Sequence, residues 1–299
     1  MHILLAVSGG IDSMYLANRA PELFPGARFA VAHCNFRLRW EESDGDEAFV
    51  RAWCGEHGLT CFVRQFDTRP YAGAGGLSIE MAARELRYAW FAELCDAHGF
   101  DAVAVAHNAD DNAETLLLNL LRGTGSRGLR GMGDRDRIVR PLLGTTRAEI
   151  REWMEAHGCA WREDSTNADS TPKRNRIRNE VFPVFERINP SFVRTLSDDM
   201  RRFARVDAIA DEYFHSVQPA LTTDSGAVRI PALLALRHWE YVLWRLVEPC
   251  VLSGPTFEKL VALLRRYRDE PLGTVTISGK TFEGAGRRLV FRGKLLFIR

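Results

Sequence analysis

Residues near the N-terminus combine glycines with hydroxyl and carboxylate side chains at a place where an anion could bind. The apolar run 3–7 leads directly into Ser8-Gly9-Gly10-Ile11-Asp12-Ser13, and a helix-like stretch follows. This strand–turn–helix order directs backbone N–H groups and the positive end of a helix dipole toward one point. Glycine lacks a Cβ and lets the backbone approach phosphate oxygens closely. We therefore predict a phosphate-binding loop at residues 8–13, in which Asp12 could hold Mg²⁺.

The same loop could be an ordinary tight turn before a helix, because glycines are common in such turns. It lacks the Gly-Lys-Ser/Thr that ends the P-loop of many nucleotide-binding proteins. It resembles instead the pyrophosphate loop of ATP pyrophosphatases, enzymes that cleave ATP to AMP and pyrophosphate while they activate a substrate as its adenylate. The resemblance implies ATP as cofactor.

A second group of chemically capable residues follows the apolar run 101–106. His107 comes first, then Asp110 and Asp111, and Glu114 lies about one helical turn later. Three carboxylates at a helix start can hold a magnesium ion or an ammonium group. Acidic residues also favour a helix N-terminus because of its dipole, so a structural role stays open.

Arginines form two further groups. Arg84 and Arg87 are one helical turn apart and can face the same anion. Arg174, Arg176 and Arg178 lie within five residues of each other. Like charges so close repel one another, and we expect an anion to bind them. The alternative is a solvated basic surface.

The elements that must position these residues alternate between strand and helix. The expected strands are apolar runs at residues 3–7, 28–33, 60–66, 101–106 and about 138–142. Such alternation predicts an α/β fold with a doubly wound parallel sheet. Ligands bind beyond the carboxyl ends of such strands, where the loop at 8–13, His33 and the acidic group should all lie.

The pattern changes after Pro183. A long charged helical segment begins near 189–191, two helical stretches follow near 231–248 and 255–267, and β-like stretches follow at 273–277, 288–291 and 295–298. We expect a catalytic domain at 1–189. A linker helix and a smaller mixed helical and β domain should occupy 190–299.

Composition bounds the class of protein. The 299 residues are 46% hydrophobic and 26% charged, which is typical of a soluble globular chain, and no apolar run approaches the length of a membrane helix. Six scattered cysteines without a Cys-x-x-Cys pair or a signal peptide indicate reduced thiols and a cytoplasmic location. The net charge of +1 hides a balance of −8 in residues 1–121 and +6 in both 122–205 and 251–299. Two basic regions suggest a polyanionic partner.

Seven motifs occur in order along the chain. They are the loop at 8–13, His33-x-Asn35 with Leu38-Arg39, Ala83-Arg84-x-x-Arg87-Tyr88, the run from Ala106 to Thr115, Arg140-Pro-Leu-Leu143, Glu163-Asp-x-Thr-Asn167 and Arg174-Asn175-x-x-Arg178. This series resembles the tRNA(Ile)-lysidine synthetase family over roughly residues 3–183. Phe36 departs from the family, which is expected to have a second histidine there.

The resemblance implies a reaction and a set of roles. Family members use ATP to adenylate the C2 oxygen of the first anticodon cytidine of tRNA(Ile) with a CAU anticodon, and the ε-amine of free L-lysine then displaces AMP to give lysidine. The resemblance implies that pyrophosphate and Mg²⁺ bind at Ser8, Gly9, Gly10, Ile11, Asp12 and Ser13, that His33 binds the nucleotide, and that Arg84 stabilises a phosphate or the adenylate. It also implies that the lysine amine or a metal binds at Asp110, Asp111 and Glu114, in a pocket that His107 shapes. The implied tRNA-binding residues are Arg174, Arg176 and Arg178.

Other functions remain open at this point. A tRNA thiolase with the same loop would use cysteine-bound sulfur or an iron–sulfur cluster, which the scattered cysteines do not favour. An amide-forming synthetase would leave both basic regions unexplained, and a non-catalytic tRNA-binding homologue would not need the acidic group. The sequence also leaves a homodimer open, and it predicts no membrane partner.

Overall fold

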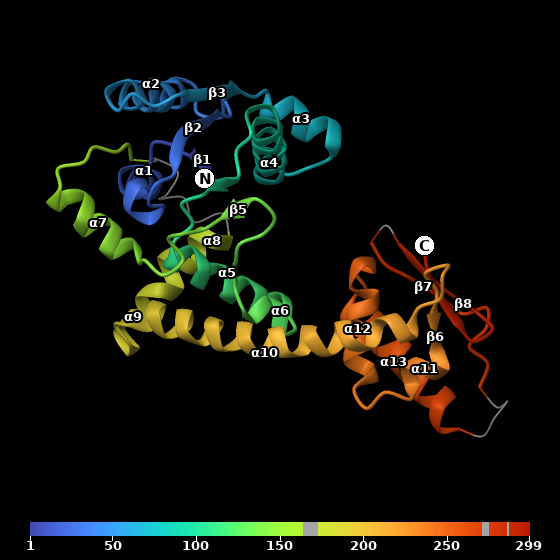
Figure 1. Ribbon diagram of the computed structural model, residues 1–299. Coiled ribbons are helices and arrows are strands. Elements are labelled where there is room, and N and C mark those ends of the chain that lie inside the picture. Colours follow the sequence, from blue (N-terminus) through green and yellow to red (C-terminus); the bar gives the residue numbers. More distant parts are fainter. Residues whose placement is uncertain (164–172, 271–274, 286) are drawn as a thin grey trace. The chain divides into compact units, whose positions relative to one another are not determined.

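The computed structural model describes residues 1–163, 173–270, 275–285 and 287–299 (Figure 1). It divides into two compact units, Met1–Arg205 and Val206–Arg299. The expected domain boundary after residue 189 lies just ahead of helix α10 (Phe192–Leu221), and the division between the two units falls between Arg205 and Val206 of that helix. No helix among the described residues is long and apolar enough to cross a membrane.

The first unit is built on a five-stranded sheet in the order β3-β2-β1-β4-β5. The strands are β1 (His2–Ala6), β2 (Arg28–Asn35), β3 (Cys61–Gln65), β4 (Ala102–Ala104) and β5 (Ile138–Val139). Every pair is parallel, so the carboxyl ends share one edge. This confirms the predicted α/β fold. Because β2 and β4 flank β1, the loop after β1 lies where the strand order reverses, the usual ligand site of such sheets.

Side chains of β1 alternate between two buried layers. Ile3 and Leu5 pack in one core with residues of α1 (Ile11–Leu23), α2 (Glu41–Glu56) and α7 (Arg147–Ala156). Leu4 packs in the other core with Trp90 and Phe91 of α4 (Ile79–His98), which follows α3 (Thr68–Gly75). Both faces of the sheet are therefore covered, as a doubly wound fold requires.

A third layer of the first unit brings a later segment against α5 (Ala109–Arg122). This segment comprises α8 (Lys173–Arg176), the π-helical turn η2 (Ile177–Val181) and α9 (Phe182–Ile188), while the short α6 (Ser126–Leu129) follows α5 directly. Ala113 and Leu118 of α5 share a buried cluster with Ile177 and Phe182. The basic residues at 173–178 therefore lie beside the helix that carries the acidic group.

The second unit combines helices with an antiparallel sheet, as expected for the C-terminal part. Its elements are β6 (Val228–Arg229), α11 (Ile230–Leu234), α12 (Trp239–Val247), the 3₁₀ turn η3 (Glu248–Cys250), α13 (Gly254–Asp269), β7 (Thr281–Glu283), β8 (Arg288–Arg292) and β9 (Leu295–Ile298), with strand order β6-β9-β8-β7. The β-like stretch expected at 273–277 lies partly outside the described residues, and its described part, 275–277, is not a strand.

Candidate active site

The loop after β1 folds around the hydroxyl of Ser13. The backbone N–H groups of Ser8 and Gly9 each donate to Ser13 Oγ at 3.1 Å, and that hydroxyl donates to the carbonyl oxygen of Gly10 at 2.8 Å. Gly9 has a φ of +97°, a backbone conformation that side-chain-bearing residues rarely adopt. Gly10 caps the N-terminus of α1. The loop therefore gathers backbone donors and two hydroxyls at the positive end of a helix dipole.

A cavity of about 370 Å³ opens beside this loop. Ser8, Gly10, Asp12 and Ser13 line it from one side, and the other lining residues include Cys34, Phe36, Arg87, Tyr88, Phe91 and His107. The cavity thus joins the ends of β1, β2 and β4 to helix α4, where a nucleotide is expected to bind.

Phe36, the departure from the family pattern, forms part of the wall of this cavity. Its ring stacks on Phe66 with 5.5 Å between ring centroids, and the guanidinium of Arg87 lies 5.3 Å from its ring centroid. A histidine would offer a hydrogen bond here, whereas Phe36 offers an apolar face backed by a second ring.

His33 lies beneath the loop rather than in this cavity. Its side chain is buried, and Nδ1 is 2.9 Å from the carbonyl oxygen of Val7. Burial lowers the pKa of His33, so the ring is neutral at physiological pH. The structure therefore places His33 as a link between the ends of β1 and β2, although the resemblance implied nucleotide binding.

Asn108 links the phosphate loop to the acidic group. It caps α5 in a capping box, in which its side chain accepts from the N–H of Asp111 and Asp111 accepts from the N–H of Asn108. The Asn108 amide also donates to Asp12 Oδ1 at 2.9 Å. A single buried amide therefore holds the first carboxylate of α1 next to the first turn of α5.

Arg147, at the start of α7, contacts the same carboxylates. Its guanidinium lies 3.8 Å from Asp12 Oδ2 and 3.5 Å from Asp111 Oδ1, and its backbone N–H donates to Asp110 Oδ2 at 2.8 Å. Sequence reasoning missed Arg147 and Asn108 as site residues. Thr146 and Glu149 form a capping box that begins α7, but no local pattern in the sequence indicates which strand end this helix start would face.

Glu114 is the most deeply buried member of the acidic group, with an exposed fraction of 0%. Its Oε1 accepts a hydrogen bond from Arg178 Nε at 2.7 Å, and its Oε2 is a buried oxygen without a hydrogen-bond partner in the described part of the chain. Burial raises the pKa of Glu114, and the Arg178 guanidinium opposes that effect. An oxygen in this state is ready to accept from a ligand donor.

Asp12 and His107 also have perturbed acidities. Burial raises the pKa of Asp12, although Arg147 opposes the shift. Burial lowers the pKa of His107 to about 4, and its Nδ1 has no hydrogen-bond partner among the described residues. His107 is therefore a neutral ring on the wall of the cavity beside the loop. Two carboxylates and an imidazole with perturbed acidity in one place are typical of a functional site.

The donors present suit a magnesium ion that is bound together with a phosphate. No group of three or more His, Cys, Asp or Glu side chains in the described residues is arranged to hold a metal ion by itself. Mg²⁺ usually takes one or two carboxylates and completes its shell with phosphate oxygens and water. Asp12 lines the loop cavity, and the nearby charge of Asp111 acts on it, so these residues fit such an ion.

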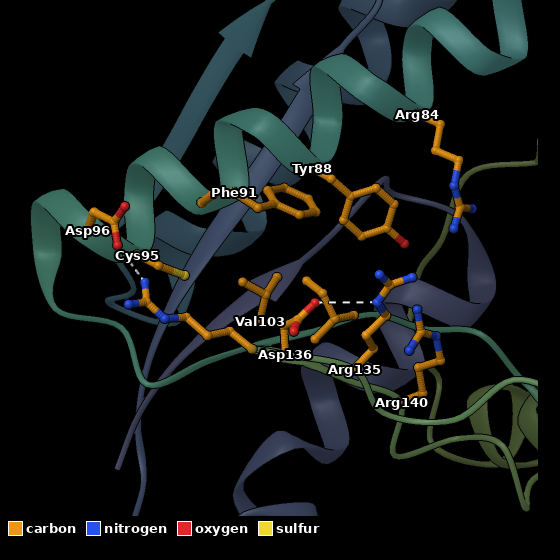
Figure 2. A pocket seen from close by; sticks show the side chains of 12 residues that line it. Arg84, Tyr88, Phe91, Cys95, Asp96, Val103, Arg135, Asp136 and Arg140 are labelled. Carbon is orange, nitrogen blue, oxygen red and sulfur yellow. Dashed lines mark hydrogen bonds and ion pairs between the residues drawn. The ribbon is translucent and has the colours of Figure 1, made fainter. Parts of the chain in front are cut away.

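A second cavity has a volume of about 560 Å³ and shares Tyr88 and Phe91 with the loop cavity as lining residues. Figure 2 shows Arg84 and Tyr88 extending from α4 toward Arg135 and Arg140. The guanidinium of Arg84 lies 5.1 Å from the ring centroid of Tyr88, and that of Arg140 donates to the carbonyl oxygen of Gly133. The described residues give neither guanidinium an ion pair with a carboxylate. The resemblance implied phosphate or adenylate stabilisation by Arg84, and the structure places its side chain on the wall of this second cavity.

The three arginines expected to bind tRNA face different ways. Arg178 points into the acidic group, and Arg174 donates to Thr115 Oγ1 of α5 at 2.7 Å. Arg176 is 63% exposed and pairs with Glu180. Most of the motif at 163–167 lies outside the described residues, which resume at Lys173.

Comparison with known proteins agrees with this geometry. Residues 1–185 match the family model described as a PP-loop domain. The tRNA(Ile)-lysidine synthase of Chlorobaculum tepidum is 41% identical over 250 residues, which cover 80% of this chain and 74% of that protein. The one from Parabacteroides distasonis is 38% identical over 297 residues, which cover 99% of this chain and 65% of that protein.

A solved structure shares the fold. The U34-tRNA thiolase NcsA from Methanococcus maripaludis with its 4Fe-4S cluster superposes with a TM-score of 0.56 at 17% identity, over 68% of this chain and 72% of that one. The chain spans 50 to 74% of the length of the first curated relatives that it matches. The match to the PP-loop model over more than half of the chain, together with these relatives, shows that the chain belongs to the tRNA(Ile)-lysidine synthase family of PP-loop proteins.

Proposed function

We propose that this protein ligates free L-lysine to C2 of the first anticodon cytidine of tRNA(Ile) with a CAU anticodon, and that it uses ATP and releases AMP and pyrophosphate. The observation that carries the proposal is the continuity of the site. Asn108 joins Asp12 of the phosphate loop to Asp111 of the acidic group, so a nucleotide and an amine would bind side by side. Membership of the lysidine synthase family supports the same reaction.

The loop cavity would hold ATP with its pyrophosphate end at Ser8–Ser13. In the first step the cytidine C2 oxygen forms a bond to the α-phosphorus of ATP, and the bond from that phosphorus to pyrophosphate breaks. Backbone donors and the α1 dipole stabilise the charge on the departing pyrophosphate. Asp12 would hold Mg²⁺, which when bound supplies further positive charge to the phosphates.

The second cavity would receive the RNA nucleotide. Arg84 and Arg140 offer guanidinium groups that form no ion pair among the described residues and could bind a backbone phosphate, and Tyr88 and Phe91 offer aromatic surface for a base. Because these two aromatic residues also line the loop cavity, a base held there lies next to the nucleotide that must adenylate it. We expect Arg84 to act on the RNA or the adenylate rather than on pyrophosphate.

The acidic group would bind lysine. Glu114 Oε2 lacks a donor and suits an ammonium group, while its charged neighbours Asp111 and Asp110 add negative potential. In the second step the neutral ε-amine forms a bond to C2, the bond from C2 to the AMP oxygen breaks, and the nitrogen gives up a proton. The raised pKa of the Glu114 carboxyl group makes it a suitable proton acceptor.

The acidity of the cysteine thiols supports a thiolase reaction less well than lysine ligation. All six cysteines are free, and Cys34 is the one that lines the loop cavity. Burial raises the pKa of Cys34 to about 12, so it stays a thiol at physiological pH and is a poor nucleophile or sulfur carrier. Free cysteines and a tRNA substrate also suit the cytoplasm, where we propose that the protein works.

Incorporation of radiolabelled lysine into a CAU-anticodon tRNA(Ile) transcript tests this function. We expect label only when ATP is present, with AMP released in equal amount. The matched control is the same transcript with uridine as the first anticodon base, which lacks the reacting nucleotide and should stay unlabelled. AMP release that depends on the tRNA but brings no lysine label would retain the adenylation step and overturn lysine as the nucleophile.

A further inference from the structure

We propose that Arg178 is a positioning residue of the active site, whose guanidinium holds Glu114 and Asp111 so that the second oxygen of Glu114 faces the amine substrate. This inference rests on the proposed function, in which the acidic group binds lysine. It changes the role of a residue that the resemblance assigned to tRNA phosphates.

One guanidinium bridges two carboxylates of the same helix face. Arg178 Nε lies 2.7 Å from Glu114 Oε1, and a terminal nitrogen of Arg178 lies 3.4 Å from Asp111 Oδ1. Residues 111 and 114 are three positions apart on α5 and therefore lie on one face. The planar fork of arginine suits such a bridge, and a lysine could replace only part of it.

This bridge determines which oxygen stays available. Two neighbouring carboxylates repel each other, and Arg178 neutralises part of their charge while it occupies Oε1 of Glu114. Oε2 remains buried with no partner in the described residues. A buried carboxylate oxygen without a donor is unfavourable, so a cationic donor that reaches it binds more tightly. Arg147 contacts Asp111 from α7 at 3.5 Å and limits its movement.

The local fold directs Arg178 inward. Ile177, next to it in the π-helical turn, is buried in a cluster with Ala113 and Leu118 of α5. Side chains two positions apart on a helix project in nearly opposite directions. Arg176 accordingly faces solvent and pairs with Glu180, whereas only 22% of the Arg178 side chain is exposed. The neighbouring arginine is thus a matched control on the same segment.

Steady-state kinetics of Arg178→Ala and Arg176→Ala test the proposal. For Arg178→Ala we expect the KM for lysine to rise roughly 10- to 100-fold, which corresponds to the loss of a charge-assisted hydrogen-bond network. The KM for ATP and the Kd for tRNA should stay within about twofold of wild type, because only the amine side loses a contact. Arg178→Lys, or millimolar guanidinium added to Arg178→Ala, should recover part of the lysine affinity. At saturating tRNA, Arg176→Ala removes only the exposed pair with Glu180 and should leave the KM for lysine unchanged.

The salt dependence of tRNA binding tests the alternative that Arg178 contacts a tRNA phosphate. A phosphate contact by Arg178 would make the slope of log affinity against log salt shallower by about 0.7–0.9 in Arg178→Ala. That result, with an unchanged KM for lysine, overturns the proposal.

A double-mutant cycle separates this proposal from the proposed function. If the wild-type protein incorporates no lysine, the proposed function fails, and the ion pair is then tested by thermal unfolding of Arg178→Ala, Glu114→Gln and the double variant. We expect the double variant to lose less Tm than the sum of the single losses, because both single changes break the same pair. Additive losses would refute the pairing.

Discussion

Replacement of Gly9 by alanine isolates the backbone strain of the phosphate loop. Gly9 has a φ of +97°, and a Cβ built there would lie 3.6 Å from Phe49 Cδ1 and from Val50 Cγ2, which is ordinary van der Waals contact. The added methyl group therefore fits, and the cost comes from the backbone conformation alone. Gly10 is the natural control, because its φ of −73° is accessible to any residue.

The size of the effect follows from these two angles. A non-glycine residue in a sparsely populated left-handed conformation costs about 1–3 kcal/mol. Alanine also lowers the conformational entropy of the unfolded chain, which stabilises the folded protein by about 0.4–1 kcal/mol. We therefore expect Gly9→Ala to lower the free energy of unfolding by about 1–2 kcal/mol. At about 2–4 °C per kcal/mol for a unit of this size, the Tm should fall by roughly 2–8 °C.

Thermal unfolding of both variants, followed by ATP-dependent AMP release, checks this prediction. Gly10→Ala should not lower the Tm, since its φ is allowed, its Cβ would meet only Ser8 Oγ at 3.6 Å, and alanine restricts the unfolded chain. Gly9→Ala should also raise the KM for ATP, because a relaxed φ moves the Gly9 N–H away from Ser13 Oγ and disturbs the loop that would hold the phosphates. An unchanged Tm and an unchanged KM in Gly9→Ala would refute the left-handed conformation at this position.

Two further predictions concern ionisable residues of the site. Asp12→Ala should abolish ATP consumption, measured by AMP release, and leave the Kd for tRNA near wild type, measured by filter binding. A parallel loss of tRNA binding would contradict the assignment of Asp12 to the nucleotide. His107→Asn should reduce acid sensitivity. Burial holds the pKa of His107 at about 4 in the folded protein, whereas a histidine in the unfolded chain has a pKa of about 6.5. As the pH falls from about 6.5 to about 4, the unfolded chain therefore binds a proton that the folded protein does not bind. The free energy of unfolding of the wild type falls over this pH range. Urea unfolding at pH 7 and pH 5 should show a smaller loss in the variant than in wild type, and equal losses would show that His107 does not titrate this way.

The fold of the first unit was predictable because its signals are local. The apolar strands alternate with helical stretches, and the glycines at 9 and 10 mark the turn after β1. Parallel strands then bring their carboxyl ends to one edge whatever the loop lengths, so the meeting of Asp12 with the residues after β4 could also be expected. The capping box at Thr146 depends on four adjacent residues, and the structure contains it.

The directions of the arginines could not be predicted, because they depend on packing between distant elements. Arg178 points inward in a segment whose Ile177 is buried against α5, about 60 residues earlier in the chain, and it pairs there with Asp111 and Glu114. From the sequence alone, the three clustered arginines were equivalent candidates for RNA phosphates. Arg84 and Arg87 were expected at one anion, yet they line different cavities with Tyr88 on the shared wall. Helical spacing places two residues near one another but does not show what lies opposite each.

The guanidinium of Arg147 has a thermodynamic consequence for the affinities of the two substrates. It lies between Asp12 and Asp111, at 3.8 Å and 3.5 Å, and so interacts with the carboxylates of the nucleotide side and the amine side at once. A cation that binds to Asp12 competes with Arg147 there and leaves more of its charge to Asp111. Occupancy of one side therefore changes affinity on the other, and linkage requires the factor to be the same in both directions. Nucleotide affinity measured with and without lysine, and lysine affinity measured with and without nucleotide, should yield one coupling constant.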